Sequence, residues 1–528
     1  MTARAVMVLG TSSHAGKSLL TAALCRIFAR QGYRVAPFKS QNMSLNSAAT
    51  AEGLEIGRAQ ALQAEAAGIR PSVHMNPILL KPLGEMASQV IVHGRIWGRL
   101  SAAEYRRRVE ELVPLVADSY RKLAIENDVI VLEGAGSPAE INLKEHDIAN
   151  MRMAAMADAS CLLVGDIDRG GVFASLLGTV ELLEPEERAR ISGFVINKFR
   201  GDVALLAPGI RALEGRMKMP CLGVVPYLDR LALEEEDSLG LADFDSLDDD
   251  RWSSTLADRP LRIAVIRFPS LANFTDFDAL SSEPSVAVRL CRNPRQLRGA
   301  DVVILPGSKQ TADDLFWLRS QGLERPVIER SKNGLVTGIC GGMQMLGELI
   351  LDPEGVESAG SIRGLALLPI HTIMRPSKVT VPVEGKLAAG SLFGQTVGDL
   401  AVRGYEIHAG ETSYIGQPRP FAQLMRQREP ADERVMDGSI SPDSRIFGTY
   451  LHGLFDGDAF RHAFITAARA FCRLGPAREL NHWESRRQES FNRLAGAVRQ
   501  SLDMAKIFGW AGLRYRPSRA REAFERVG

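Results

Sequence analysis

The sequence lacks the marks of several protein classes. Among its 528 residues, no apolar stretch approaches the ~20 residues that a membrane-spanning helix needs. The six cysteines, at 25, 161, 221, 291, 340 and 472, are scattered without a CxxC pair, which argues against a zinc site or a disulfide framework. The net charge of +1 favours neither nucleic acid nor an anionic membrane as a partner. A glycine-rich loop begins at residue 10, leaving no room for a signal peptide, and we expect a cytoplasmic protein.

One cysteine stands in an informative context. An apolar β-branched run, residues 335–339, ends at Cys340, and Gly341 and Gly342 follow before an amphipathic stretch. Glycines permit a sharp strand-to-helix turn, and a helix N-terminus favours a thiolate. A lone cysteine in a soluble protein is usually a buried core residue. The flanking glycines favour a nucleophile instead.

A phosphate-binding loop is predicted near the start of the chain. The short apolar run 5–9 leads into residues 10–18, which begin with Gly10 and end with Gly16, Lys17 and Ser18, and a helical stretch follows. Backbone N–H groups of such a loop cradle phosphates, the lysine reaches the terminal phosphates and the serine hydroxyl ligates Mg²⁺. An ordinary strand-turn-helix would not require the Lys-Ser pair.

The pattern of apolar runs predicts two α/β domains. Continuous short runs before residue 230 are typical of parallel strands that are buried on both faces. We expect a phosphate-loop domain over 1–230, an acidic linker over 231–258, a second α/β domain over 259–470, and a helical extension with a basic tail over 471–528. The apolar stripe Phe491, Leu494, Val498 and Leu502 indicates packing of that extension.

A histidine in the second domain is the candidate partner of Cys340. His452 follows the apolar run 447–451 and precedes a glycine, so it lies at the end of a predicted strand. A thiol nucleophile needs a general base, and such partners meet in space rather than in sequence. Backbone N–H groups at Gly307 and Ser308, after the strand 302–305, and at Gly341 are candidates for an oxyanion hole.

These residues make the second half resemble the class I glutamine amidotransferases, with a flavodoxin-like fold. The resemblance assigns Cys340 as nucleophile, His452 as base and residues 305–308 as the oxyanion turn. The common form has a Glu two residues after the histidine, where this chain has Leu454. That departure is typical of the cobyric acid and cobyrinic acid diamide synthase branch. In that branch, Glu406 and His408 shape the glutamine site, although an ordinary strand explains both equally well.

The first half resembles dethiobiotin synthetase and its relatives, P-loop enzymes that activate a carboxylate with ATP. Glu133 ends a buried run, where a carboxylate is costly unless it binds something, and Mg²⁺ is its natural partner. The resemblance places Lys39 near the transferring phosphate and makes Asn197 a candidate purine contact. The alternative interpretations are that Lys39 is an exposed lysine and that Asn197 belongs to an ordinary turn at the end of a strand.

Longer runs make the chain similar to the cobyric acid synthase family. They are residues 39–46, 75–82, 166–173 and 273–278. The resemblance implies ATP, Mg²⁺, glutamine and a corrinoid, adenosylcobyrinic acid a,c-diamide, whose b, d, e and g carboxylates become amides. It implies neither nucleic acid nor a membrane, and leaves a homo-oligomer open.

Three alternatives use parts of the same pattern. A cobyrinic acid a,c-diamide synthase shares both halves, but the runs around Asn42 and Asn76 argue against it. A CTP synthase-like enzyme is disfavoured by Leu454, where a Glu is expected. A partitioning-type ATPase would carry an additional lysine at the position of Ser12, and it has no use for Cys340.

Overall fold

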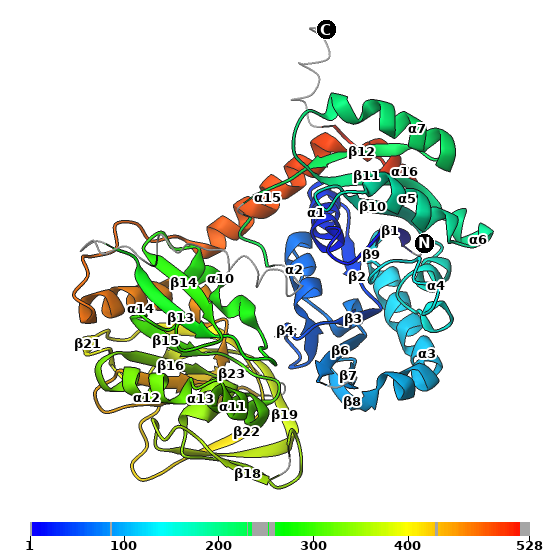
Figure 1. Ribbon diagram of the computed structural model, residues 1–528. Coiled ribbons are helices and arrows are strands. Elements are labelled where there is room, and N and C mark those ends of the chain that lie inside the picture. Colours follow the sequence, from blue (N-terminus) through cyan, green and yellow to red (C-terminus); the bar gives the residue numbers. More distant parts are fainter. Residues whose placement is uncertain are drawn as a thin grey trace.

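The computed structural model describes residues 3–84, 87–229, 231–234, 252, 259–358, 360–427 and 431–517. Figure 1 shows two α/β units side by side, with a C-terminal helix running from the second back to the first. The predicted fold class, two α/β domains followed by a helical C-terminal region, is confirmed. Most of the predicted acidic linker, 231–258, and the end of the basic tail, 518–528, lie outside the described residues.

The first unit is built on a six-stranded parallel sheet in the order β12-β11-β10-β1-β9-β2. Its apolar strands are buried between two layers of helices, α1 with the C-terminal helices on one face and α3, α4, α5 and α7 on the other. The strands are β1 (Arg4–Gly10), β2 (Val35–Phe38), β9 (Val129–Glu133), β10 (Ser160–Asp166), β11 (Ile191–Phe199) and β12 (Cys221–Pro226). The helices are α1 (Lys17–Arg30), α3 (Ala102–Glu126), α4 (Met151–Met156), α5 (Val172–Glu181), α6 (Pro185–Arg188) and α7 (Ala207–Met217).

A small lobe of the first unit faces the second unit (Figure 1). It contains a four-stranded sheet in the order β3-β6-β7-β8, a two-stranded sheet of β4 and β5, and helix α2. The bounds are β3 (Gln41–Met43), β4 (Ser47–Ala49), β5 (Glu55–Gly57), α2 (Arg58–Ala67), β6 (Ile78–Leu83), β7 (Ala87–Val92) and β8 (Arg95–Ser101). This lobe has many buried polar residues, which sets it apart from the apolar main sheet.

The second unit contains two sheets around one core. The first, β14-β13-β15-β16-β26-β25, is parallel except for β25, and comprises β13 (Leu261–Ile266), β14 (Val286–Cys291), β15 (Val302–Leu305), β16 (Leu335–Ile339), β25 (Ser439–Ile440) and β26 (Ile446–Thr449). The second, mostly antiparallel, comprises β17 (Leu349–Asp352), β18 (Gly360–Arg363), β19 (Ile370–Leu387), β22 (Ala401–Tyr414), β23 (Ala422–Arg426), β24 (Glu433–Asp437) and β27 (Leu451–His452). A hairpin of β20 (Ser391–Leu392) and β21 (Gln395–Thr396) and helices α10 (Asp278–Ser281), α11 (Thr311–Ser320), α12 (Glu324–Asn333), α13 (Gly341–Leu346) and α14 (Asp458–Phe471) complete the unit.

The C-terminal helices return to the first unit. The predicted stripe on α15 (Trp483–Ser501), including Phe491 and Val498, is buried in the same core as helix α1. From α16 (Met504–Trp510), Phe508 packs on Phe28 with ring centroids 4.3 Å apart. Because α15 spans both units, it ties them into one molecule. The return to the first unit is not part of the sequence-based prediction.

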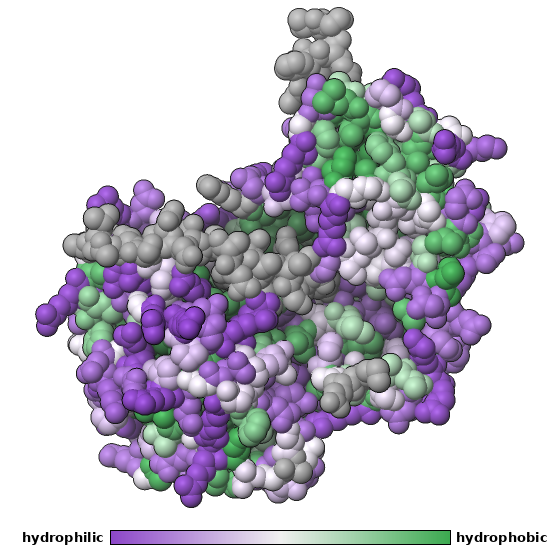
Figure 2. All heavy atoms as spheres, in the orientation of Figure 1, coloured by the Kyte–Doolittle hydropathy of each residue, from purple (hydrophilic) through white to green (hydrophobic). Residues whose placement is uncertain are grey.

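Hydrophilic residues cover most of the face in Figure 2, and hydrophobic residues gather mainly over the first unit. In the part of the chain that the structure describes, no helix is long and apolar enough to cross a membrane.

Candidate active sites

Cys340 lies at a sharp turn between strand β16 and helix α13. Its φ of 52° is in the left-handed region, which is unusual for a residue with a side chain and marks a position held by its surroundings. The glycines around it are required by close packing: a Cβ at Gly342 would lie 1.9 Å from the carbonyl oxygen of Leu305. The predicted strand-Cys-turn is therefore present, with a helix of only six residues after it.

His452 lies beside Cys340 and is almost fully buried. Both residues line one cavity of about 60 Å³, together with Gly307, Gly341 and His408. Burial disfavours the charged imidazole, but the Asp276 carboxylate and a hydrogen bond with Cys340 outweigh it and raise the pKa of His452 to about 10. The structure thus brings together the predicted nucleophile and the predicted base.

Asp276 is the group that orients His452. His452 Nδ1 donates to Asp276 Oδ2 at 2.7 Å, and the backbone N–H of Gly453 donates to the other oxygen at 2.9 Å. Asp276 lies in the 3-10 helix Phe274–Phe277, 1% exposed. It compensates for Leu454, which occupies the position of the usual Glu.

Of the remaining residues predicted for the thiol site, Gly307, Gly341 and His408 line the cavity, whereas Glu406 is not among the residues that line it. A Cβ at Gly307 would lie 3.0 Å from His452 Cε1, and one at Gly341 would lie 3.0 Å from the backbone nitrogen of Ser308, so both turns need glycine to approach the catalytic pair. His408 stacks on Tyr450 and its Nδ1 lies 2.8 Å from the carbonyl oxygen of Gly410. Glu406, also predicted for this site, forms an ion pair with Arg426 at 2.6 Å.

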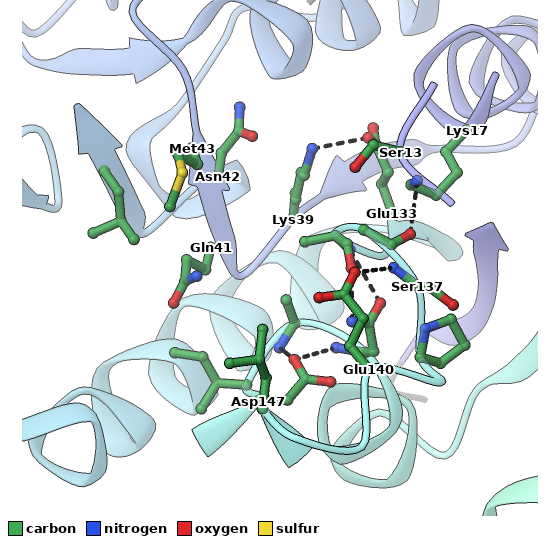
Figure 3. Close-up of a pocket in the computed structure, with 18 of the residues that line it drawn as sticks. Ser13, Lys17, Lys39, Gln41, Asn42, Met43, Glu133, Ser137, Glu140 and Asp147 are labelled. Atoms are coloured by element: carbon green, nitrogen blue, oxygen red, sulfur yellow. Dashed lines mark hydrogen bonds and ion pairs between the residues drawn. The ribbon is translucent and has the colours of Figure 1, made fainter. Parts of the chain in front are cut away.

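The phosphate loop follows β1 and ends in helix α1, as predicted. Lys17 Nζ donates to the carbonyl oxygens of Ser12 at 2.9 Å and Gly136 at 3.0 Å, which holds the ammonium at the mouth of the loop (Figure 3). Gly16 has a φ of 95°, and a Cβ at Gly10 would lie 3.0 Å from Lys17 Nζ. The loop lines a cavity of about 640 Å³.

Glu133, at the end of β9, is hydrogen-bonded to several polar side chains of this site. It is 1% exposed, and it accepts hydrogen bonds from Ser18 Oγ at 2.8 Å, Lys39 Nζ at 2.9 Å and Gln63 Nε2 at 2.5 Å. Figure 3 shows Lys39 pointing toward Glu133. Burial would raise the pKa of Glu133, but Lys39, Gln63 and Ser18 together lower it. An ionised carboxylate beside a serine hydroxyl is the kind of oxygen donor set that Mg²⁺ prefers.

Asn197, predicted as a purine contact, makes a different interaction. Its side-chain amide donates to the carbonyl oxygen of Ala15 at 2.9 Å, and a Cβ at Gly16 would lie 2.1 Å from it. Asn197 therefore stabilises the phosphate loop through a hydrogen bond to its backbone. A contact with a purine stays a prediction.

Two of the sequence runs quoted above meet at the junction of the units. The backbone N–H of Ser47 donates to Asn273 Oδ1 at 2.9 Å, and that of Phe274 donates to Asn46 Oδ1 at 3.2 Å. This reciprocal pair lies next to Asp276 and holds the small lobe against the thiol cavity. Neither run contains a spacing that would have predicted the contact.

Models of known protein families match both halves of the chain. Residues 6–240 match the family model described as CobQ/CobB/MinD/ParA nucleotide binding domain, and residues 262–460 match CobB/CobQ-like glutamine amidotransferase domain.

Similar proteins extend the match over almost the whole chain. Cobyric acid synthase from Syntrophobacter fumaroxidans is 48% identical over 97% of this chain and 99% of its own. The protein of that name from Sorangium cellulosum is 49% identical over 97% of this chain and 99% of its own, and that from Citrobacter koseri is 48% identical over 96% and 98%. With a nucleotide-binding half, a glutamine amidotransferase half and relatives of this similarity, the chain belongs to the cobyric acid synthase family of glutamine-dependent ligases, with an amidation role in cobalamin biosynthesis.

Proposed function

We propose that the chain converts adenosylcobyrinic acid a,c-diamide to adenosylcobyric acid by amidating the b, d, e and g carboxylates, with glutamine and ATP as co-substrates. The observation that carries the proposal is the presence in one chain of a Cys340–His452–Asp276 group and a Lys17–Ser18–Glu133 group. The first is suited to releasing ammonia from an amide, and the second to activating a carboxylate with a nucleotide.

At the thiol site, Cys340 Sγ attacks the side-chain amide carbon of glutamine. Backbone N–H groups at Ser308 and Gly341 are the donors for the oxyanion, and the His452 imidazolium gives its proton to the departing ammonia. Asp276 keeps His452 protonated until this transfer and holds the imidazole in position throughout. Water then attacks the thioester, which releases glutamate and regenerates the thiol.

At the phosphate loop, Lys17 neutralises charge on the phosphates of ATP while a substrate carboxylate attacks the γ-phosphorus and displaces ADP. Ammonia then attacks the acyl phosphate, which gives the amide and inorganic phosphate. Ser18 and Glu133 would hold Mg²⁺, which when bound supplies positive charge to the phosphates. Lys39 Nζ, which lies 2.9 Å from Glu133, would contact the transferring phosphate.

The cavity beside the loop supports a large acidic substrate. It holds about 640 Å³, and Arg106 and Lys144 are among the residues that line it, so both contribute positive charge that suits carboxylate arms, with Lys144 also paired with Glu187 at 2.8 Å. The free thiols fit the reducing cytoplasm as the compartment of the reaction.

The test uses purified protein with glutamine, ATP and Mg²⁺ and compares two corrinoids by mass spectrometry. We expect adenosylcobyrinic acid a,c-diamide to gain four amides, and cobyrinic acid to gain none at a and c. Amidation of cobyrinic acid at a and c without turnover of the diamide would establish the diamide synthase alternative instead.

A further inference from the structure

The cavity around Cys340 contains charged side chains for which the proposed chemistry has no role. Besides the catalytic pair and the oxyanion turns, Lys81, Lys309, Lys378 and Glu357 line it. Lys81 comes from strand β6 of the first unit, so both units build the cavity. At about 60 Å³ it lies well below the ~300 Å³ that drug-sized ligands need, which suits a single amino acid.

Two of the three lysines are already neutralised. Glu55 of the small lobe is paired through one oxygen with Lys81 and through the other with Lys378, at 2.6 Å in the latter case. Lys81 also donates to Ser47 Oγ at 2.8 Å. Because Lys378 belongs to β19, this ion-pair cluster fastens the small lobe onto the rim of the cavity.

Lys309 and Glu357 differ from that cluster because the charge of neither side chain is fully balanced by a neighbouring opposite charge. The Lys309 ammonium makes no hydrogen bond or ion pair with any residue that the structure describes, and burial together with Lys378 and Lys81 lowers its pKa to about 7. Glu357 accepts the backbone N–H of Thr311 at 2.6 Å, and burial raises its pKa to about 7 in spite of Lys309 and Thr311. A zwitterionic ligand would add an anion beside Lys309 and a cation beside Glu357, in addition to the attraction between the two side chains.

We propose that Lys309 and Glu357 form the subsite for the amino-acid end of glutamine, with Lys309 binding the α-carboxylate and Glu357 the α-ammonium. The inference rests on the proposed use of glutamine at Cys340. Lys309 directly follows the Gly307-Ser308 turn, so the chain segment that holds the oxyanion also holds the carboxylate. The Lys81–Glu55–Lys378 cluster joins the two units at the rim of this cavity.

The test compares three substrates in the glutaminase reaction: glutamine, its decarboxylated analogue and its deaminated analogue. In Lys309→Met we expect kcat/KM for glutamine to fall roughly thirtyfold, mainly through KM, because truncating one partner of a desolvated charge pair has at least this cost. Activity on the decarboxylated analogue should stay the same, since that analogue has nothing for Lys309 to bind. Glu357→Gln should show the corresponding pattern with the deaminated analogue.

Lys386→Met removes an exposed lysine from the same unit and serves as the matched control. An equal loss on glutamine and on the decarboxylated analogue would mean that Lys309 only supports the oxyanion turn, and it would overturn the subsite. Unchanged KM for glutamine would do the same.

Labelling of Cys340 separates this inference from the proposed function. A diazoketone analogue of glutamine carries the amino-acid end, whereas iodoacetamide does not. In Lys309→Met we expect slower labelling by the diazoketone and normal labelling by iodoacetamide, measured by intact mass. If Cys340→Ser retains glutaminase activity, the proposed function fails. If Cys340→Ser is inactive while Lys309→Met reacts normally with both reagents, the subsite alone fails.

Discussion

Replacement of Asp276 by Asn tests the contact that the structure adds to the Cys–His pair. In the native protein the pKa of His452 is raised from an ordinary 6.5 to about 10, against the opposing effect of burial. At about 1.4 kcal/mol per tenfold change in proton affinity, this raised pKa corresponds to roughly 5 kcal/mol in favour of the imidazolium, shared by Asp276 and Cys340. An amide in place of Asp276 removes the carboxylate charge and leaves burial to act on His452. We expect glutamine-dependent kcat/KM to fall about 10²- to 10⁴-fold, the usual contribution of a general acid–base group.

The raised pKa of His452 determines how stability and glutaminase activity should change with pH. Because the folded-state pKa of His452 is raised, its contribution to stability is present in full below pH 6.5 and is lost as pH rises through about 10. The native glutaminase should therefore keep its general acid up to about pH 10. In Asp276→Asn the alkaline limb of the activity profile should move to lower pH, and the melting temperature should depend less on pH between 7 and 10 than in the native protein.

The assay measures glutamate release and amidation with added ammonia on the same preparations. Asp278→Asn is the matched control, since burial and the nearby Glu234 and Asp456 raise the pKa of Asp278 well above its ordinary value, and a neutral carboxyl resembles an amide. Ammonia-dependent amidation should be unchanged in both variants. Full glutaminase activity in Asp276→Asn with an unmoved alkaline limb would refute the role of Asp276, because a merely structural aspartate would leave the limb in place.

Three further substitutions separate the two sites. Cys340→Ser should abolish glutamine-dependent amidation and spare ammonia-dependent amidation, so continued use of glutamine would exclude Cys340 as nucleophile. Lys17→Ala should abolish amidation with either nitrogen source, at a cost of several kcal/mol in transition-state stabilisation, and near-normal turnover with ammonia would contradict a phosphate contact. Glu133→Gln should keep basal glutaminase activity but require far more Mg²⁺ for amidation; a normal Mg²⁺ titration with a lowered melting temperature would make Glu133 a structural residue.

The sequence predicted the elements whose signal is local. Continuous apolar runs identified the buried parallel strands, and the glycines at Cys340 and in the phosphate loop marked turns that only small residues permit. The stripe from Phe491 to Val498 predicted a packed helix, though not that it would pack on helix α1 of the first unit. Local periodicity shows which face of a helix is buried but not its partner.

Asp276 could not be predicted because its signal is not local. It lies 176 residues before His452, in a short turn of 3-10 helix, and an aspartate in such a turn usually caps backbone N–H groups. One signal was present: Leu454 removes the usual orienting carboxylate, so another acid had to take its place. The run 273–278 was identified only by its resemblance, and the structure shows that it carries Asp276 to His452 and also contacts Asn46 of the first unit.

One hairpin of the small lobe forms a wall of both cavities. Strands β6 and β7 pair antiparallel, with Lys81 opposite Gln89 and Pro82 opposite Ser88. Leu80 and Ser88 line the cavity of the phosphate loop, whereas Lys81 and Gln89 line the cavity of Cys340.

Because successive side chains of a strand point to opposite faces, one pair of strands serves both sites without any residue belonging to both. A slip of one residue in this pairing would exchange every side chain between the two cavities. The Lys81–Glu55 ion pair and the contact of Lys378 with Glu55 resist such a slip, since Lys81 can reach Glu55 from only one face. The charged cluster at the rim of the thiol cavity therefore also fixes the wall of the phosphate cavity, so the ammonia source and the carboxylate activation site share a single structural element.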